Sequence, residues 1–140
     1  EGVDIFIKRI KHYTTFEYIE IPELKNTSSL SKEQIKEKEG DLILKHLRNT
    51  DKVILLDERG RSFTSIEWSK EIGREIISGT KSLVFIVGGA YGFSQSVYDR
   101  ADGKLSLSSM TFSHQIIRLF FIEQLYRAFT IIKGEPYHNE

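Results

Sequence analysis

The residues best suited to chemistry lie at the end of the chain. Tyr137 and His138 belong to the terminal segment GEPYHNE and follow Pro136 directly. An imidazole can accept or relay a proton at neutral pH, and a phenol can stack on an aromatic ring or donate a hydrogen bond. Terminal segments are often disordered and without function, which is the alternative interpretation. The tail can act chemically only if other parts of the fold position it.

Two loops rich in small residues form a candidate ligand pocket. One contains Gly88, Gly89 and Gly92, and the other, from Leu107 to Phe112, carries hydroxyl groups and the single Met. Small residues let a ligand approach backbone atoms closely. The glycine spacing differs from that of dinucleotide-binding and phosphate-binding loops, and no lysine follows directly. A neutral, adenine-bearing ligand therefore fits better than a nucleoside triphosphate.

Each of these loops also has an interpretation that involves no ligand. The three glycines suit a strand-to-helix turn with positive φ, which is the favoured interpretation when they are taken alone. The second loop suits a helix start that is capped by Thr111 or Ser113. A cap and a pocket use different atoms, so both interpretations of the second loop can hold.

The remaining polar residues give weaker signals. His12, His46 and His114 lack the spacing of metal ligands, and the chain has no Cys, so we expect neither a metal site nor a disulfide. A chain without Cys fits a cytoplasmic protein. The charged stretch from Asp57 to Arg61 favours a turn, in which Arg59 could also face a substrate.

Strands and helices are predicted to alternate around these loops. Apolar runs at Val53 to Asp57 and Leu83 to Val87 are typical of buried parallel strands, and a short strand is expected from Lys104 to Leu107. Phe16 to Ile21 alternates with period two and predicts a further strand. The pattern indicates an α/β fold, a mostly parallel sheet flanked by helices, with ligands beyond the carboxyl ends of the strands.

Capping residues predict where the helices begin. Ser31 with Gln34 and Thr64 with Glu67 form capping boxes, and Gly79 ends the second of these helices. Trp68, Ile72 and Ile76 should form its apolar face. Three more helices are expected: the end of an amphipathic one before Tyr13, a short one from Ser94 to Arg100, and the longest from Ser113 to Lys133.

The last helix has more apolar surface than one sheet can cover. Glu123, Arg127 and Thr130 form one narrow polar stripe, and the apolar arc spans roughly 200°. A second copy of the chain could cover the excess, or the chain could cover it alone; the width favours a homodimer through residues 113–133. Arg118 falls inside the apolar arc and should have an acidic, carbonyl or RNA partner.

Length and composition limit the possible classes. The 140 residues suit one domain, and 20 basic residues balance 20 acidic ones, so net charge gives no support to nucleic-acid binding. No apolar run approaches the roughly 20 residues that span a bilayer, and no signal peptide is recognisable. The chain begins with Glu, which is compatible with a fragment.

Four blocks in order carry a resemblance to a known family. VGGAYGF, LSLSSMTFSHQ, EQLYRAF and GEPYHNE, together with LLDERG upstream, resemble the RlmH (YbeA-type) group of SPOUT methyltransferases. The resemblance covers most of the chain. It implies a C-terminal trefoil knot, a homodimer, S-adenosylmethionine as cofactor and no metal. The family begins with a strand and a glycine-lysine turn that this sequence lacks, so one SPOUT domain, residues 1–140, is expected without that strand.

The resemblance also implies a reaction and a site. The reaction is methylation of N3 of a pseudouridine in 23S rRNA of the assembled ribosome, in which the ribosome's shape would guide a neutral protein. Tyr137 and His138 would be catalytic. Family tails often have a basic residue next, where this sequence has Asn139. The cofactor would be bound by Leu56, Gly88, Leu107, Ser108, Ser109, Met110, Thr111 and Phe112.

Two other functions remain compatible with the loops. One is a non-catalytic α/β interaction protein that binds S-adenosylmethionine or a nucleotide, and the other is a small-molecule methyltransferase on the same scaffold. A glycine-lined pocket does not separate these alternatives. Tyr137 and His138 would complete a site shared between two protomers. Such a site is meaningful only for catalysis, so the tail favours an enzyme over a non-catalytic binding protein.

Overall fold

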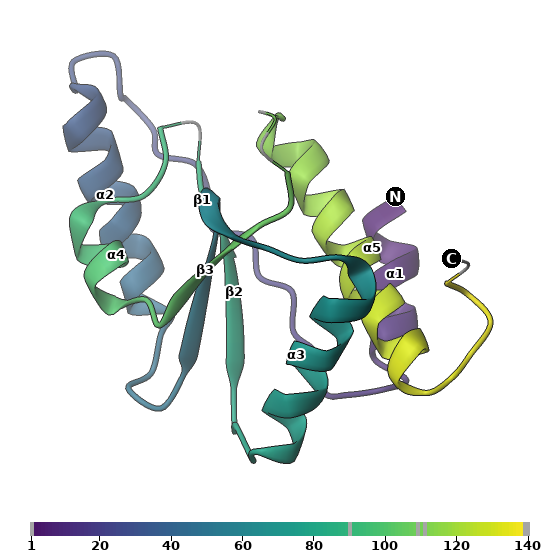
Figure 1. Ribbon diagram of the computed structural model, residues 1–140. Coiled ribbons are helices and arrows are strands. Elements are labelled where there is room, and N and C mark those ends of the chain that lie inside the picture. Colours follow the sequence, from purple (N-terminus) through teal and green to yellow (C-terminus); the bar gives the residue numbers. More distant parts are fainter. Residues whose placement is uncertain (1, 90, 109, 111, 139–140) are drawn as a thin grey trace.

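The computed structural model describes residues 2–89, 91–108, 110 and 112–138, which form a three-stranded sheet between two layers of helices (Figure 1). The strands follow the order β2-β1-β3 and both pairs are parallel, which confirms the predicted α/β class. The strands are β1 (Lys52–Ser62), β2 (Leu83–Val87) and β3 (Gly103–Ser106). The helices are α1 (Gly2–Ile10), α2 (Lys32–Lys45), α3 (Ser65–Ile77), α4 (Gln95–Arg100) and α5 (His114–Ile132).

Both faces of the sheet are covered by helices. Val53 and Leu55 are fully buried in a cluster with side chains of α2 and α4. Ile54 and Leu56 point to the opposite face and pack against the larger cluster, which α1, α3 and α5 supply. Figure 1 shows the two layers on either side of the strands. Because successive side chains alternate between two apolar faces, β1 has a continuous apolar sequence.

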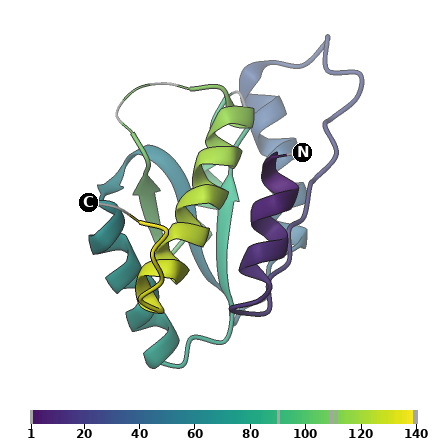
Figure 2. The ribbon, with the colours of Figure 1, turned by 90° about the vertical axis from the view of Figure 1, so that its right-hand side faces the viewer.

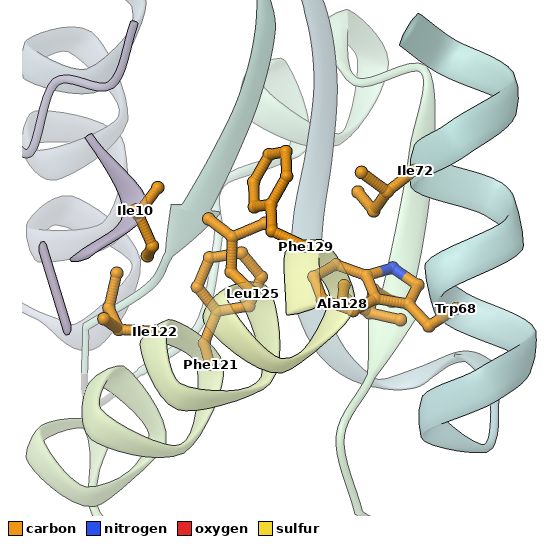
Figure 3. Close-up of a cluster of buried hydrophobic side chains, with 9 residues drawn as sticks. Ile10, Trp68, Ile72, Phe121, Ile122, Leu125, Ala128 and Phe129 are labelled. Carbon is orange, nitrogen blue, oxygen red and sulfur yellow. The ribbon is translucent and has the colours of Figure 1, made fainter. Parts of the chain in front are cut away.

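The main core forms where α5 lies against the sheet between α1 and α3 (Figures 2 and 3). The ring of Phe121 lies 5.7 Å from the ring of Trp68 on α3 and 4.8 Å from that of Phe85 on β2. Each large apolar side chain buried in this way contributes roughly 1.5–3 kcal/mol. The other buried members of the cluster are Ile10, Ile72, Leu105, Ile122, Leu125, Ala128 and Phe129.

This packing changes the interpretation of the wide apolar arc on α5. Phe121 and Leu125 are each only 5% exposed within a single chain. Because α1 and α3 flank α5 on two sides, one chain covers most of the arc by itself. Thr130, expected on the polar stripe, is fully buried, and its hydroxyl donates to the Arg127 carbonyl at 2.7 Å. Arg118 pairs with Glu20 at 3.7 Å, which confirms an acidic partner.

The predicted helix starts are confirmed in detail. Ser31 and Thr64 both form reciprocal capping boxes, with Gln34 and Glu67 as their partners. The Ser113 hydroxyl accepts from the Ile116 N–H at 3.3 Å and thereby caps α5. These bonds satisfy backbone donors that have no partner within the helix.

β1 is longer than predicted, because the stretch expected to be a turn is a bulge. Leu56 pairs with Leu105 of β3, the chain then bulges, and Arg61 pairs with Leu105 again. Gly60 makes the second pairing possible: a Cβ there would lie 2.7 Å from the Leu105 nitrogen and the Lys104 carbonyl carbon. Only glycine allows this approach of two backbones.

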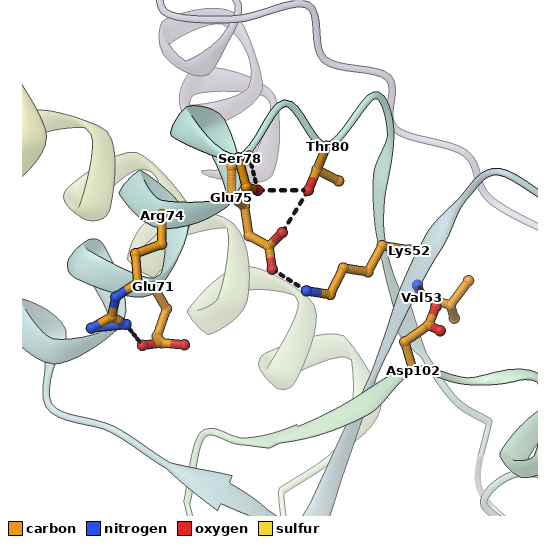
Figure 4. Close-up of polar contacts among 8 residues, drawn as sticks. All are labelled: Lys52, Val53, Glu71, Arg74, Glu75, Ser78, Thr80 and Asp102. Carbon is orange, nitrogen blue, oxygen red and sulfur yellow. Dashed lines mark hydrogen bonds and ion pairs between the residues drawn. The ribbon is translucent and has the colours of Figure 1, made fainter.

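Polar contacts fix the start of β1 (Figure 4). The Lys52 ammonium pairs with Glu75 of α3, which also accepts from the Thr80 hydroxyl at 2.7 Å. On the other side, the Asp102 carboxylate accepts from the Val53 N–H at 2.8 Å, and the Asp102 N–H donates to the Val53 carbonyl at 2.8 Å. The strand therefore begins at a defined residue between α3 and the turn that leads into β3.

Two predictions about local structure are wrong. Phe16 to Ile21 is not a strand in the described structure, although Phe16 and Tyr18 do pack against the main core. Alternating burial is thus present, but a strand also requires a hydrogen-bonded neighbour. Ile76, expected on the buried face of α3, is 57% exposed, so the buried face ends before the last turn of the helix, which ends at Ile77.

We expect Gly60→Ala and Gly73→Ala to have opposite effects on stability. Gly60→Ala forces the β1 and β3 backbones apart and should cost roughly 1–3 kcal/mol. Gly73 lies within α3 with open space around its missing Cβ, so Gly73→Ala should stabilise by about 1 kcal/mol. Urea unfolding followed by fluorescence of Trp68, the single Trp, measures both. Equal stability of the Gly60→Ala variant and the wild type would contradict the close crossing.

Candidate functional site

The carboxyl ends of the three strands meet at one edge of the sheet. Leu56 pairs with Val87 on one side and with Leu105 on the other. Gly88 directly follows Val87, and Leu107 follows β3, so the sheet brings the predicted residues Leu56, Gly88 and Leu107 to the same edge. Ligands of parallel sheets bind at such edges.

The glycine turn after β2 is shaped by close contacts more than by backbone strain. A Cβ at Gly88 would lie 3.0 Å from the ring of Phe93, so glycine is needed there for packing alone. The Gly92 N–H donates to the Gly89 carbonyl at 3.2 Å, and φ of Gly92 is 83°. The turn with positive φ that the glycines predicted is therefore present, and Gly92 is the residue that adopts this conformation.

The loop that follows β3 is organised by Ser108. Its carbonyl accepts from the Ser106 hydroxyl at 3.1 Å, and its own hydroxyl accepts from the Met110 N–H at 3.0 Å. Met110 is 69% exposed, and the ring of Phe112 meets the ring of Phe120 edge-on at 5.4 Å. The predicted site residues Ser109 and Thr111, and Asn139 in the tail, lie outside the described residues.

A pocket of about 300 Å³ adjoins this loop on the α3 and α5 side. Leu107 lines it, but Leu56 and Gly88 do not, so the pocket coincides with the predicted cofactor site only at that residue. Its polar wall includes Gln124, which accepts from the Ser65 hydroxyl at 2.7 Å. The full lining is Phe63, Thr64, Ser65, Trp68, Leu105, Ser106, Leu107, Phe120 and Gln124.

Asp57 connects the end of β1 to α4. Its carboxylate accepts hydrogen bonds from the Tyr98 hydroxyl, from the Arg59 N–H at 2.9 Å and from the Arg59 guanidinium. Burial acts to raise the pKa of Asp57, but the bonds from Tyr98 and Arg59 outweigh it and lower the pKa to about 2. Arg59 thus has a structural partner inside the bulge, which favours a structural role for this residue over contact with a substrate.

The tail folds back onto α5 of its own chain. The Tyr137 hydroxyl donates to Glu123 Oε2 at 3.0 Å, and the Arg127 guanidinium donates to the same oxygen at 2.7 Å. Arg127 Nη1 also lies 3.0 Å from His138 Nδ1. Glu123 and Arg127 were recognised in the sequence only as a polar stripe. The sequence did contain a signal: two oppositely charged residues four positions apart on an otherwise apolar helix indicate that a polar segment docks there.

Aromatic contacts and a second anchor support this arrangement. The Tyr137 ring meets the Tyr126 ring at 4.8 Å, and the Arg127 guanidinium lies 4.9 Å from the Tyr137 ring centre. At the start of the tail, the Tyr13 hydroxyl donates to the Glu135 carboxylate at 2.8 Å. Burial and then the bond to Glu123 raise the pKa of Tyr137, so its phenol stays protonated at neutral pH and can donate.

Within one chain the tail docks far from the loops at the sheet edge. Tyr137 and His138 contact Glu123 and Arg127, whereas the loop after β3 ends where α5 begins at His114. At about 1.5 Å rise per residue, Glu123 lies about 14 Å further along the helix axis. The two predicted halves of the site are therefore not brought together by the contacts of one chain.

The described ranges contain neither a metal site nor a membrane-spanning helix. No group of three or more His, Asp and Glu side chains there could hold a metal ion. The ring of His46 instead contacts the Leu42 carbonyl, with Nδ1 at 2.9 Å. No helix of the described chain combines the length and apolar character needed to cross a bilayer.

The low pKa of Asp57 makes its contribution to stability depend on pH. A carboxylate whose pKa is lower in the folded than in the unfolded state stabilises the fold at pH values above its unfolded-state pKa. This stabilisation is lost as the pH falls through the folded-state pKa. Asp57→Asn should therefore cost roughly 2 kcal/mol at pH 7 and about half as much near pH 3. Urea unfolding at both pH values tests this, and a loss independent of pH would show that charge is not involved.

Comparison with known proteins places the chain in a family. A family model described as "Predicted SPOUT methyltransferase" matches residues 1–138. The chain is 54% identical over 138 residues to "Ribosomal RNA large subunit methyltransferase H" of Flavobacterium johnsoniae, covering 99% of this chain and 88% of that protein. Proteins of the same name from Christiangramia forsetii and Bacteroides fragilis are 55% and 54% identical, with 98% and 99% of this chain and 87% and 88% of theirs covered. The chain belongs to the SPOUT methyltransferases, which use S-adenosylmethionine as methyl donor.

Proposed function

We propose that this protein transfers a methyl group from S-adenosylmethionine to N3 of a pseudouridine in 23S rRNA, with the assembled ribosome as substrate. The observation that carries the proposal is identity of 54–55% over nearly the whole chain to methyltransferases named for large-subunit ribosomal RNA. Residues 1–140 act as one domain, in the cytoplasm and without a metal. A net charge of +0 favours a substrate whose shape guides docking over naked RNA.

The cofactor is bound at the carboxyl edge of the sheet. Leu56, Gly88 and Leu107 lie there together, and the Ser108 loop offers backbone and hydroxyl groups next to them. A turn of small residues beside an apolar strand end fits adenosine, which needs close backbone approach. We further propose that this part of the chain is knotted. Membership of the SPOUT family, for which the resemblance implies a C-terminal knot, supports this path.

The chemistry requires a methyl donor and a route for one proton. The ring nitrogen N3 attacks the methyl carbon, the carbon–sulfur bond breaks with its electrons going to sulfur, and N3 loses its proton. His138 accepts or relays this proton, since an imidazole nitrogen can act as a general base. Tyr137 stacks on the target base or donates a hydrogen bond to it.

A homodimer brings the tail to the cofactor. Docking of the tail on α5, about 14 Å from the loops, supports a site in which one protomer's tail completes the pocket of its partner. Ile116, Leu119 and Phe120 lie on one face of α5 and are 45%, 37% and 44% exposed. This apolar face, in the first half of α5, is the proposed interface, because it continues the core surface that α1 and α3 leave uncovered.

Replacing Ile116 and Leu119 together by Glu should give a folded monomer without activity. Charged side chains on this face would be buried without partners in a dimer but would be solvated in a monomer. Sedimentation at micromolar concentration measures the change. Ile77→Glu, at a position 88% exposed on α3, is the matched control and should remain dimeric. A monomeric wild type would contradict the interface.

His138→Ala should slow methyl transfer on the order of 100-fold while leaving cofactor affinity and dimerisation unchanged. Loss of a positioned proton acceptor typically has an effect of this size. The assay is single-turnover methylation of ribosomes that lack the modification, with mass mapping of the 23S rRNA and calorimetry of cofactor binding.

Truncation after Glu135 should have the same effect, because it keeps the contact between Tyr13 and Glu135 and removes only the residues beyond it. Wild-type rates in the truncated protein would show that the tail is inert. A wild-type protein that methylates a different nucleotide, or only small molecules, would refute the proposed substrate.

A further inference from the structure

Glu39 of α2 lies directly against the glycine turn. A Cβ on Gly89 would be 2.9 Å from Glu39 Oε2 and 3.0 Å from Oε1. The position of Glu39 is set by its neighbour Gly40, where a Cβ would lie only 2.4 Å from the Ser94 hydroxyl oxygen at the start of α4. Figure 1 shows the turn after β2 bending toward α2. Close backbone packing therefore holds this carboxylate at the carboxyl edge of the sheet.

Glu39 differs from the other partly buried carboxylates in its hydrogen bonding. Asp57, Glu75 and Glu123 each accept bonds from at least two groups. Asp51 and Glu71 each accept from one, the Arg48 N–H and the Arg74 guanidinium. Glu39 Oε1 is closed to solvent and has no hydrogen-bond donor among the described residues. A desolvated carboxylate oxygen without a partner is costly, and such an exception calls for a group that the chain itself does not supply.

The electrostatics of Glu39 agree with this geometry. Its pKa is raised, first by burial and then by the charge of Glu23, while His114 lowers it. His114 is the first residue of α5 and follows the loop that holds Leu107 and Ser108. Glu39 thus lies against the glycine turn and within electrostatic reach of His114 at the start of α5, which follows the second segment of the proposed cofactor pocket.

We propose that Glu39 is a cofactor-binding residue whose carboxylate pairs with a cationic group of S-adenosylmethionine. This inference rests on the proposed location of the cofactor at the carboxyl edge of the sheet. The cofactor has two cations, the sulfonium and the α-ammonium, and either one would supply the partner that Glu39 Oε1 lacks. If the sulfonium is the partner, the carboxylate also binds the methyl donor more tightly than the product, because the sulfur of the product is an uncharged thioether.

Calorimetry with three ligands shows which of the two cations, the sulfonium or the ammonium, pairs with Glu39. S-adenosylmethionine carries both cations, S-adenosylhomocysteine only the ammonium, and 5′-methylthioadenosine neither. Glu39→Gln keeps the shape and removes the charge, and should weaken binding of S-adenosylmethionine at least tenfold. If Glu39→Gln binds S-adenosylhomocysteine as tightly as the wild type does, the partner of Glu39 is the sulfonium. If the variant loses the same affinity for S-adenosylmethionine and S-adenosylhomocysteine, and none for methylthioadenosine, the partner is the ammonium.

Glu37→Gln is the matched control, because Glu37 is exposed on the same helix and the substitution makes the same change of charge. It should leave all three affinities unchanged. Urea unfolding should find Glu39→Gln as stable as the wild type or more so, since an unpaired buried charge is removed; a structural role would give a less stable variant.

Equal affinity of the wild type and Glu39→Gln for S-adenosylmethionine would overturn the assignment of Glu39 and leave the proposed function intact. A similar loss for methylthioadenosine would also overturn it, because this ligand has no cation. A wild-type protein that does not bind S-adenosylmethionine at all would instead contradict the proposed function itself.

Discussion

The fold depends on β1, because both other strands of the described sheet pair with it and not with each other. Its first half is buried on both faces, and its second half passes over β3 at Gly60 with no room for a side chain. This crossing sets the direction in which the chain leaves the sheet, and so the place where α3 begins at its Thr64 cap. The bulge between the two paired stretches turns Asp57 toward Tyr98, which ties α4 to the same edge.

α5 divides its surface among three tasks according to the chemistry of its faces. Phe121, Leu125 and neighbouring residues pack against β2, α1 and α3. Glu123 and Arg127 hold the tail through charge-assisted hydrogen bonds, which are stronger than bonds between neutral groups. Ile116, Leu119 and Phe120 remain partly exposed near the start of the helix. One helix thus supplies part of the core, the docking surface of the tail and a partly exposed apolar face.

Carboxylates at the sheet edge differ in how many hydrogen bonds the protein donates to their oxygens. Asp57 has partners on two sides and a pKa of about 2, so its charge belongs to the fold. Glu39 lies on α2 next to Gly40, which packs closely on Ser94, and its Oε1 has no donor among the described residues. Satisfied polar groups stabilise structure, and unsatisfied ones mark positions where a ligand gains most by binding.

Local signals in the sequence determined the elements and the family. Capping boxes at Ser31 and Thr64, the helix start at Ser113 and the strands β1 and β2 depend on residues close in sequence, and each was confirmed. The burial of β2 was predicted wrongly: it was expected to be fully buried, but all its residues are only partly buried, because β2 lies at the edge of the described sheet. The four sequence blocks likewise identified the family, because motif order is a property of the chain alone.

Tertiary structure decided what depends on residues distant in sequence. The stretch Phe16 to Ile21 alternates as a strand does, but no described neighbour pairs with it. The bulge and resumed pairing of β1 depend on the backbone of Leu105, and the docking of Tyr137 on Glu123 depends on a chain reversal after Gly134. The placement of Glu39 Oε1 against the glycine turn, with no donor among the described residues, follows from how α2 packs on α4. Hydrogen bonds and close contacts between separate elements have no periodic pattern in the sequence, so only the folded chain reveals them.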